Sequence, residues 1–222
     1  MADTHKTKQS DTKTRILDEA EKLFAQNGFK NTSISLLARK AHVNQAAVNY
    51  HFGSKGALVE QVISRRISPI DRQRMANLQA IEETATRQGR PPAIEDLLRA
   101  YIEPAFILTE TAPGEKWFLV IAGRAFSEPD ETIRNVFIRH FEPAFLLLVA
   151  LMKEALPGLS DAVLRWRLHF VLGALSHAMR LCGSHRLPVA SAPPPDTTET
   201  VVRHLVAFLA TGMDAPDDAE HE

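Results

Sequence analysis

The sequence lacks most of what a disulfide-stabilised, secreted or membrane-spanning protein needs. Its only cysteine is Cys182, which excludes a disulfide within the chain and a cysteine-based metal site. Its longest apolar runs are much shorter than the roughly 20 residues of a membrane-spanning helix. The polar N-terminus, MADTHKTKQSDTKTR, has no apolar core of a secretory signal. We therefore expect a cytoplasmic protein without a membrane partner.

The sequence also has few signs of strands or of catalytic chemistry. No segment alternates polar and apolar residues over the length of a strand, so the expected fold class is all-α. We find no Gly-rich phosphate loop, no nucleophile–base arrangement and no cluster of metal ligands. The chain is therefore not expected to be an enzyme, and no cofactor or metal is expected. Its 222 residues, of which 45% are apolar, can still bury a sizeable core.

The small net charge of −1 is the sum of two halves of opposite sign. Residues 1–66 carry 11 lysines and arginines against 6 acidic residues, whereas residues 67–222 carry 15 against 21. A basic head on an acidic body indicates that only the head meets a polyanion. Chance drift in surface charge is the alternative explanation.

Apolar residues recur at helical spacing through almost the whole chain. Asp11 or Thr12 can cap the first helix, and Thr32 or Ser33 can cap the second. Breaks between later helices fall at segments with proline or glycine. The expected helices run over about 12–27, 34–41, 45–52, 54–88, 93–111, 115–127, 130–155, 160–182 and 197–213.

The three short helices at the start, with a tight turn between the second and third, describe a helix-turn-helix over residues 33–52. Val43 and Val48 are expected to fill the core between the last two helices. The opposite side of the third helix carries short, neutral side chains of the kind that read base edges. These candidates are Asn44, Gln45, Ala46, Asn49 and Tyr50. His51 and Lys55, where the next helix begins, suit phosphate groups.

The same residues carry a resemblance to a known family. Thr32-Ser33-Ile34, Leu37–Ala41 and the run Val48-Asn49-Tyr50-His51-Phe52-Gly53-Ser54-Lys55 resemble the N-terminal signature of the TetR family of bacterial regulators. The resemblance covers about residues 12–66 and implies a homodimeric repressor of the bacterial cytoplasm with a ligand-binding helical body. It also implies operator contacts by Thr32, Ser33, Asn44, Gln45, Ala46, Asn49, Tyr50, His51 and Lys55. His42 stands where the family usually has glycine, so we expect a positive φ there.

This resemblance sets the expected division of the chain. Residues 11–71 would form the DNA-binding domain, 72–213 the ligand-binding and dimerisation body, and 214–222 a disordered tail. The helices at 160–182 and 197–213 are apolar on more than one face, which favours dimerisation through them. An all-α enzyme or carrier for an acyl or aromatic substrate is the alternative function. A third possibility is a constitutive DNA-binding protein whose body only dimerises.

Three internal prolines, Pro69, Pro104 and Pro143, are expected to kink helices of the body around one cavity, although coincidence is an alternative. Arg124 is the only charge in the apolar run 117–126, so it needs a partner. That partner is an acidic side chain, Glu103 or Glu142, or the anionic head of an apolar or acyl effector. The candidate ligand-binding residues are Tyr101, Glu103, Phe106, Trp117, Arg124, Phe145, Trp166 and Phe170. The body also resembles, more loosely, a fatty-acid-responsive TetR subgroup.

Overall fold

The computed structural model describes residues 2–111, 115–124, 131–184 and 197–216. In these ranges it contains nine α-helices and no strand, which confirms the all-α class. The helices are α1 (Ala2–Asn27), α2 (Ile34–Lys40), α3 (Gln45–Phe52), α4 (Lys55–Gln88), α5 (Ile94–Thr111), α6 (Glu115–Arg124), α7 (Glu131–Ala155), α8 (Asp161–Ser184) and α9 (Thr198–Met213). The end of the expected helix 115–127 and most of the expected tail lie outside the described residues.

The expected start of the first helix is wrong. α1 begins at Ala2 rather than after a cap at Asp11 or Thr12, because the segment before them contains neither proline nor glycine to stop a helix. Of the two caps proposed for α2, Ser33 is the one used, and its hydroxyl accepts the Leu36 N–H. The later boundaries agree closely with the prediction because local signals mark them.

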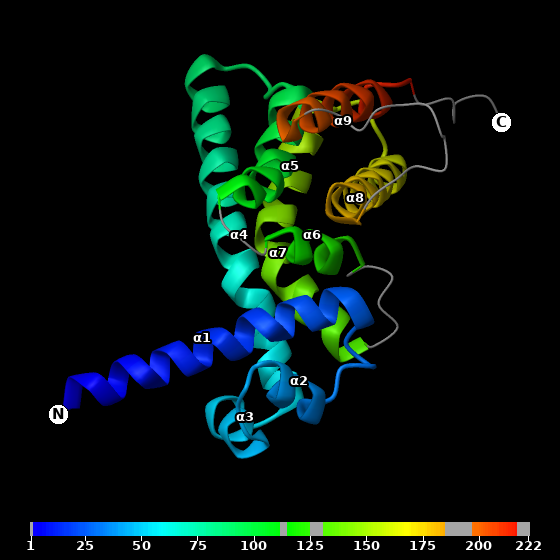
Figure 1. Cartoon of the computed structure of the whole chain (residues 1–222). Coiled ribbons are helices and arrows are strands. Elements are labelled where there is room, and N and C mark those ends of the chain that lie inside the picture. Colours follow the sequence, from blue (N-terminus) through cyan, green and yellow to red (C-terminus); the bar gives the residue numbers. More distant parts are fainter. Residues whose placement is uncertain (1, 112–114, 125–130, 185–196, 217–222) are drawn as a thin grey trace.

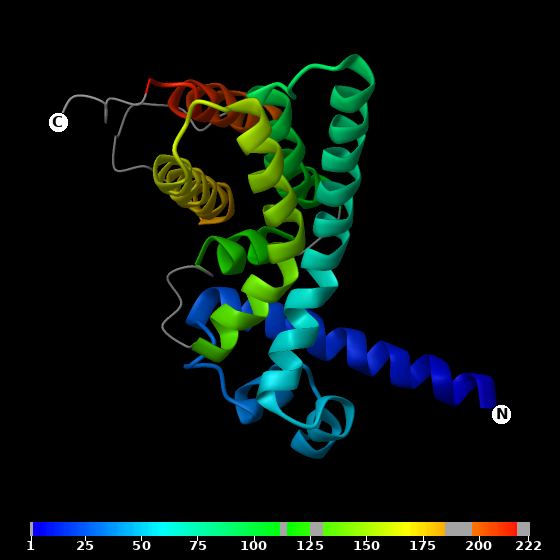
Figure 2. The ribbon, with the colours of Figure 1, turned by 180° about the vertical axis from the view of Figure 1, so that it is seen from behind.

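The molecule has a small head and a larger helical body (Figure 1). Helices α1 to α3 and the start of α4 form the head, and α4 then runs along one side of the body. Helix α7 packs beside α4, while α8 and α9 lie on the side away from α4 (Figures 1 and 2). Helix α6 packs against α8 and also contacts α1, so it connects the body to the head.

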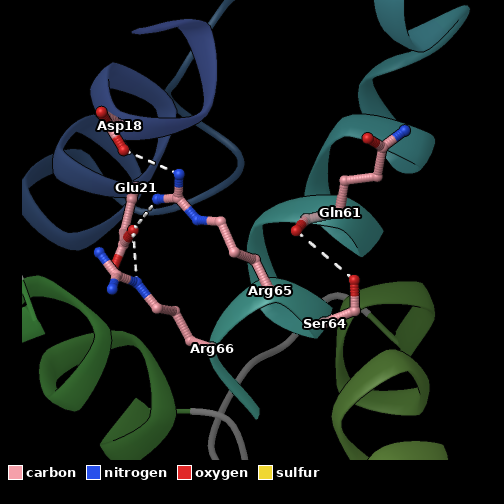
Figure 3. A network of polar contacts seen from close by, with 6 residues as sticks. All are labelled: Asp18, Glu21, Gln61, Ser64, Arg65 and Arg66. Atoms are coloured by element: carbon pink, nitrogen blue, oxygen red, sulfur yellow. Dashed lines mark hydrogen bonds and ion pairs between the residues drawn. The ribbon is translucent and has the colours of Figure 1, made fainter. Parts of the chain in front are cut away.

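The head is held to α4 by a network of ion pairs around Glu21, shown in Figure 3. The Glu21 side chain is buried and accepts hydrogen bonds from Arg65 at 2.5 Å and from Arg66 Nε at 3.0 and 3.1 Å. Arg65 also donates to the exposed Asp18 at 2.8 Å. Because α1 supplies the carboxylates and α4 the guanidiniums, the network fixes the angle between head and body.

Helix α7 is apolar on average, although charged residues such as Arg139 and Glu142 interrupt its apolar runs. Within the described ranges it is the one helix long and apolar enough, by length and composition, to cross a membrane. In the structure it packs against α4 and α5, and it buries Val136, Phe137 and Leu148. Its apolar side chains therefore meet other helices of the body, as in the core helix of a globular domain.

Candidate nucleic-acid interface

Two side-chain caps and a left-handed turn residue hold α2 and α3 at a fixed angle. Ser33 caps α2, and the Asn44 side chain caps α3 by accepting the Ala47 N–H at 2.7 Å. His42, in the turn between them, has a φ of 52°, the only positive φ among the non-glycine residues that the structure describes. The positive φ expected at His42 is therefore confirmed, and histidine takes the conformation that glycine adopts most easily.

Helix α3 has one buried side and one exposed side. Val48 and Phe52 are buried in the head, and Val43 packs half-buried against the same core. The candidates for base contact are all exposed on the other side: Asn44, Gln45, Ala46, Asn49 and Tyr50. Tyr50 is 75% exposed, so it is a surface residue, as expected, while Phe52 belongs to the core. The sequence pattern thus identifies which side of α3 is exposed.

The orientation of Gln45 is fixed by a residue that sequence reasoning missed. The Gln45 amide Nε2 donates to the Ser35 hydroxyl of α2 at 2.8 Å. Gln45 is exposed, and the bond uses one of its two amide N–H groups. Ser35 is exposed beside the Ser33 cap, but nothing in the local sequence indicates a bond ten residues away.

Two of the expected operator contacts have structural partners instead. Thr32 is buried, and its hydroxyl donates to the carbonyls of Gly28 at 2.9 Å and Leu23 at 3.3 Å. Thr32 therefore closes the turn between α1 and α2, and its contact with DNA stays a prediction. Lys55 is half-buried, and its Nζ donates to the Phe29 carbonyl at 2.5 Å. In this conformation Lys55 braces α4 against the head.

The head carries other cations besides Lys55. Lys30, Arg39 and Lys40 are exposed, the last two in the final turn of α2. The Lys13 ammonium lies 5.9 Å from the Phe52 ring centre. These side chains were absent from the expected contacts, although the Arg39-Lys40 pair is a visible signal in the sequence. Together they give the head the charge that phosphate binding requires.

The body contains a pocket that three proline-containing helices border. This body pocket has a volume of about 40 Å³ and is lined from α4 to α8 by Ile67, Ile70, Arg74, Tyr101, Ala105, Phe118, Ala122, Phe137, Phe141, Leu172, Leu175, Ser176 and Met179. Pro69, Pro104 and Pro143 all lie within helices, as expected. Lining residues flank Pro69 and Pro104 on both sides and precede Pro143, which agrees with the idea of one shared cavity.

Most of the expected ligand residues do not line this pocket. Tyr101 does, whereas Phe145 borders a separate groove between α7 and α8. Trp166 and Phe170 are 65% and 66% exposed and do not line it, because α8 turns them outward, so their contact with a ligand stays a prediction. The other expected residues that the structure places do not line it either: Glu103, Phe106 and Trp117. The Arg124 side chain lies outside the described part of the chain.

The charged residue that the structure places in the pocket is Arg74. Its Nε donates to the Tyr101 carbonyl at 2.7 Å, its Nη1 pairs with Asp71 at 3.2 Å, and its guanidinium lies 4.2 Å from the centre of the Tyr101 ring. Burial raises the pKa of Asp71 to about 6 despite the attraction of Arg74, and it also raises the pKa of Tyr101. The sequence contains a signal for the burial of Arg74, because Arg74 shares one helical face with the apolar Ile67 and Leu78.

The structured part of the chain holds no group of three or more His, Cys, Asp or Glu side chains that could bind a metal ion. The geometry offers two candidate sites: the exposed side of α3, with neutral polar side chains, and an apolar pocket in the body whose lining includes the buried Arg74 guanidinium.

Comparisons with known proteins agree with this division. A sequence profile described as "Bacterial regulatory proteins, tetR family" matches residues 16–62. A second, described as "Tetracyclin repressor-like, C-terminal domain", matches residues 99–212, which is half of the chain. The first covers the head, and the second covers most of the body.

Individual proteins show the same relationship. The chain is 43% identical over 53 residues to a Bacillus subtilis protein named "Probable HTH-type transcriptional regulator YttP", a match that covers 24% of this chain and 26% of YttP. The hemolysin II transcriptional regulator HlyIIR shares the fold, with a TM-score of 0.63 at 16% identity over 94% of this chain and 99% of that one. So does the fatty acid degradation regulator FadR of Bacillus halodurans, with a TM-score of 0.59 at 12% identity over 92% and 97%.

The match to YttP spans about a quarter of that protein, whereas the fold likeness spans nearly the whole of both structures. The two profiles together cover the helix-turn-helix and the helical body in the order in which the structure presents them. The chain therefore belongs to the TetR family of bacterial transcriptional regulators, a family of DNA-binding regulators rather than enzymes.

Proposed function

We propose that the protein is a homodimeric cytoplasmic repressor that binds operator DNA through α3 and leaves it when a small apolar or acyl molecule fills the body. The observation that carries the proposal is the exposed side of α3. Gln45 and Asn49 present amide groups there, and Ala46 presents a methyl group. Amides pair with adenine edges and methyls contact thymine in the major groove.

A dimer is supported by aromatic side chains that α8 and α9 expose. Trp166 and Phe170 stack with ring centres 6.2 Å apart on α8, and Phe208 of α9 is 73% exposed. These two helices pack together on the side of the body away from α4 (Figure 1). Exposed aromatic side chains on adjoining helices are typical of a protein interface. A twofold dimer would bring two copies of α3 to successive major grooves.

Release by an effector is supported by the length of α4 and by the body pocket. Helix α4 has 34 residues, begins next to α3 and borders the pocket at Ile67 and Ile70. A molecule that binds the pocket more tightly in one orientation of α4 shifts the spacing of the two heads. The name of FadR, a fatty acid degradation regulator, agrees with an acyl effector but describes that protein.

The proposal is tested by operator selection followed by fluorescence anisotropy. The selected operator should bind far more tightly than a random duplex, and Gln45→Ala should lose about 1–3 kcal/mol on the operator while random DNA changes little. Gln79→Ala, on the exposed surface of the body, is the matched control and should bind like the unaltered protein. Equal losses on operator and random DNA would show that Gln45 positions the protein without reading bases.

A further inference from the structure

Arg74 has more hydrogen-bond donors than the surrounding protein satisfies. It is 5% exposed, and it uses one N–H on the Tyr101 carbonyl and one on Asp71. No acceptor in the part of the chain that the structure describes bonds to its Nη2. In this pair the buried polar atom without a hydrogen-bond partner is Asp71 Oδ2. The remaining Arg74 N–H groups stay available to an acceptor in the pocket that Arg74 lines.

The unused donors lie at the body pocket. Apart from Arg74, Tyr101 and Ser176, the side chains that line it are apolar. Its volume of about 40 Å³ corresponds to roughly three water molecules. In this state it has room for a polar head and a few carbons, and a longer chain requires the apolar lining to move.

We propose that the body pocket binds a compact apolar molecule through one acceptor oxygen, of a carbonyl or a carboxylate, which receives N–H bonds from Arg74. This inference rests on the proposed function, because it names the class of effector that the body would bind. An ammonium head can donate to Asp71 Oδ2, which is buried without a hydrogen-bond partner, but it also places a second positive charge beside the Arg74 guanidinium. A hydrocarbon fills the space but leaves the Arg74 donors unpaired.

The charge of Asp71 determines whether the binding of a carbonyl and the binding of a carboxylate depend differently on pH. The groups that face Asp71 are Arg74 on the same helix, Tyr101 of α5 and His140 of α7. A carbonyl leaves the Asp71–Arg74 pair unchanged, whereas a carboxylate adds a second negative charge beside Arg74. Binding of a carboxylate then draws a proton onto Asp71, since burial already raises the pKa of this group to about 6. Carboxylate affinity should rise as the pH falls from 7.5 to 6, and carbonyl affinity should stay constant.

The test uses the full-length protein without DNA and three small probes of similar size. These are 2-hexanone, pentanoate and pentylammonium, added at millimolar concentration and followed by methyl NMR of Leu172, Leu175 and Met179. We expect saturable shifts with 2-hexanone or pentanoate, and none with pentylammonium. The dependence on pH shows which oxygen the pocket accepts. No shift with either acceptor probe would overturn the proposal.

Two variants test separately whether binding needs the Arg74 donors and whether it needs the volume of the body pocket. Arg74→Met keeps a long side chain but removes every donor, and it should weaken acceptor binding at least about tenfold. Ala105→Leu keeps Arg74 but fills the pocket, and it should abolish binding even if Arg74→Met fails to fold. Arg99→Met, on the solvent side of α5, is the control and should bind normally. Undiminished binding by Ala105→Leu, or by folded Arg74→Met, would overturn the inference.

Operator binding measured on the same samples keeps the two proposals distinguishable. If the protein binds operator but neither acceptor probe, the inference about Arg74 fails and the proposed repressor remains. If the acceptor probes bind but no operator can be selected, the proposed repressor fails and the pocket assignment remains.

Discussion

Replacing Glu21 by glutamine should destabilise the protein by about 3 kcal/mol, because the head is joined to α4 through this carboxylate (Figure 3). Glu21 is 2% exposed at its side chain and accepts three hydrogen bonds from Arg65 and Arg66. Removing one partner of a buried ion pair costs about 3–5 kcal/mol. The lower end applies here, since both arginines are partly hydrated and Arg65 keeps its bond to Asp18.

Urea unfolding followed by circular dichroism measures this loss. With an m-value of about 2 kcal/mol/M, the midpoint should fall by about 1.5 M. Protein concentration must be matched, because a dimer is stabilised by its own concentration. Asp18→Asn is the control: Asp18 is 57% exposed, so its loss should cost less than about 1 kcal/mol. If Glu21→Gln is no less stable than Asp18→Asn, the buried network does not hold the head.

Three further outcomes follow from the structure. Replacing Trp166 and Phe170 together by serine should convert the proposed dimer to monomer in sedimentation velocity without loss of helicity, and an intact dimer would place the interface elsewhere. Burial raises the pKa of Asp71 to about 6 in the folded protein, against 3.8 in the unfolded chain. The free energy of unfolding, compared with that of Asp71→Asn, should therefore rise by about 2–3 kcal/mol as the pH falls from 7 to 4. A flat difference in urea titrations would contradict this. Gly123→Ala places a Cβ 2.7 Å from an α8 carbonyl, so it should lower the midpoint of thermal unfolding. Gly158→Ala, in open space, should leave this midpoint unchanged, and equal midpoints for the two variants would refute the close helix contact.

Local signals in the sequence predict the helices and the exposed side of α3. Ser33 and Ser54 cap helices where their residue types indicate, and Gly89 ends α4 in a left-handed conformation. The polar side of α3 is exposed because the apolar Val48 and Phe52 fix the opposite side to the core. These features depend on neighbours within a few residues, so a single sequence contains them.

Contacts between distant segments are what the sequence alone does not predict. Periodicity shows that Arg74 lies on an apolar face of its helix, but not that Tyr101 of α5 would meet it. Thr32 is buried because the carbonyls of α1 and of the turn after it come within reach of its hydroxyl. Trp166 fits a pocket wall and a dimer face equally well until packing decides which side of α8 is covered.

Entry of two copies of α3 into successive major grooves can be measured by DNA cleavage from α3 itself. Because Cys182 is the only cysteine, a Cys182→Ser background allows an iron chelate to be attached at Ala46→Cys alone. Cleavage of the operator should fall in two patches whose centres lie about 34–36 Å apart, one turn of the duplex. The same chelate at Ala80→Cys, exposed on the body part of α4, should leave the operator uncut. A single patch, or cleavage from position 80 in place of position 46, would contradict the account.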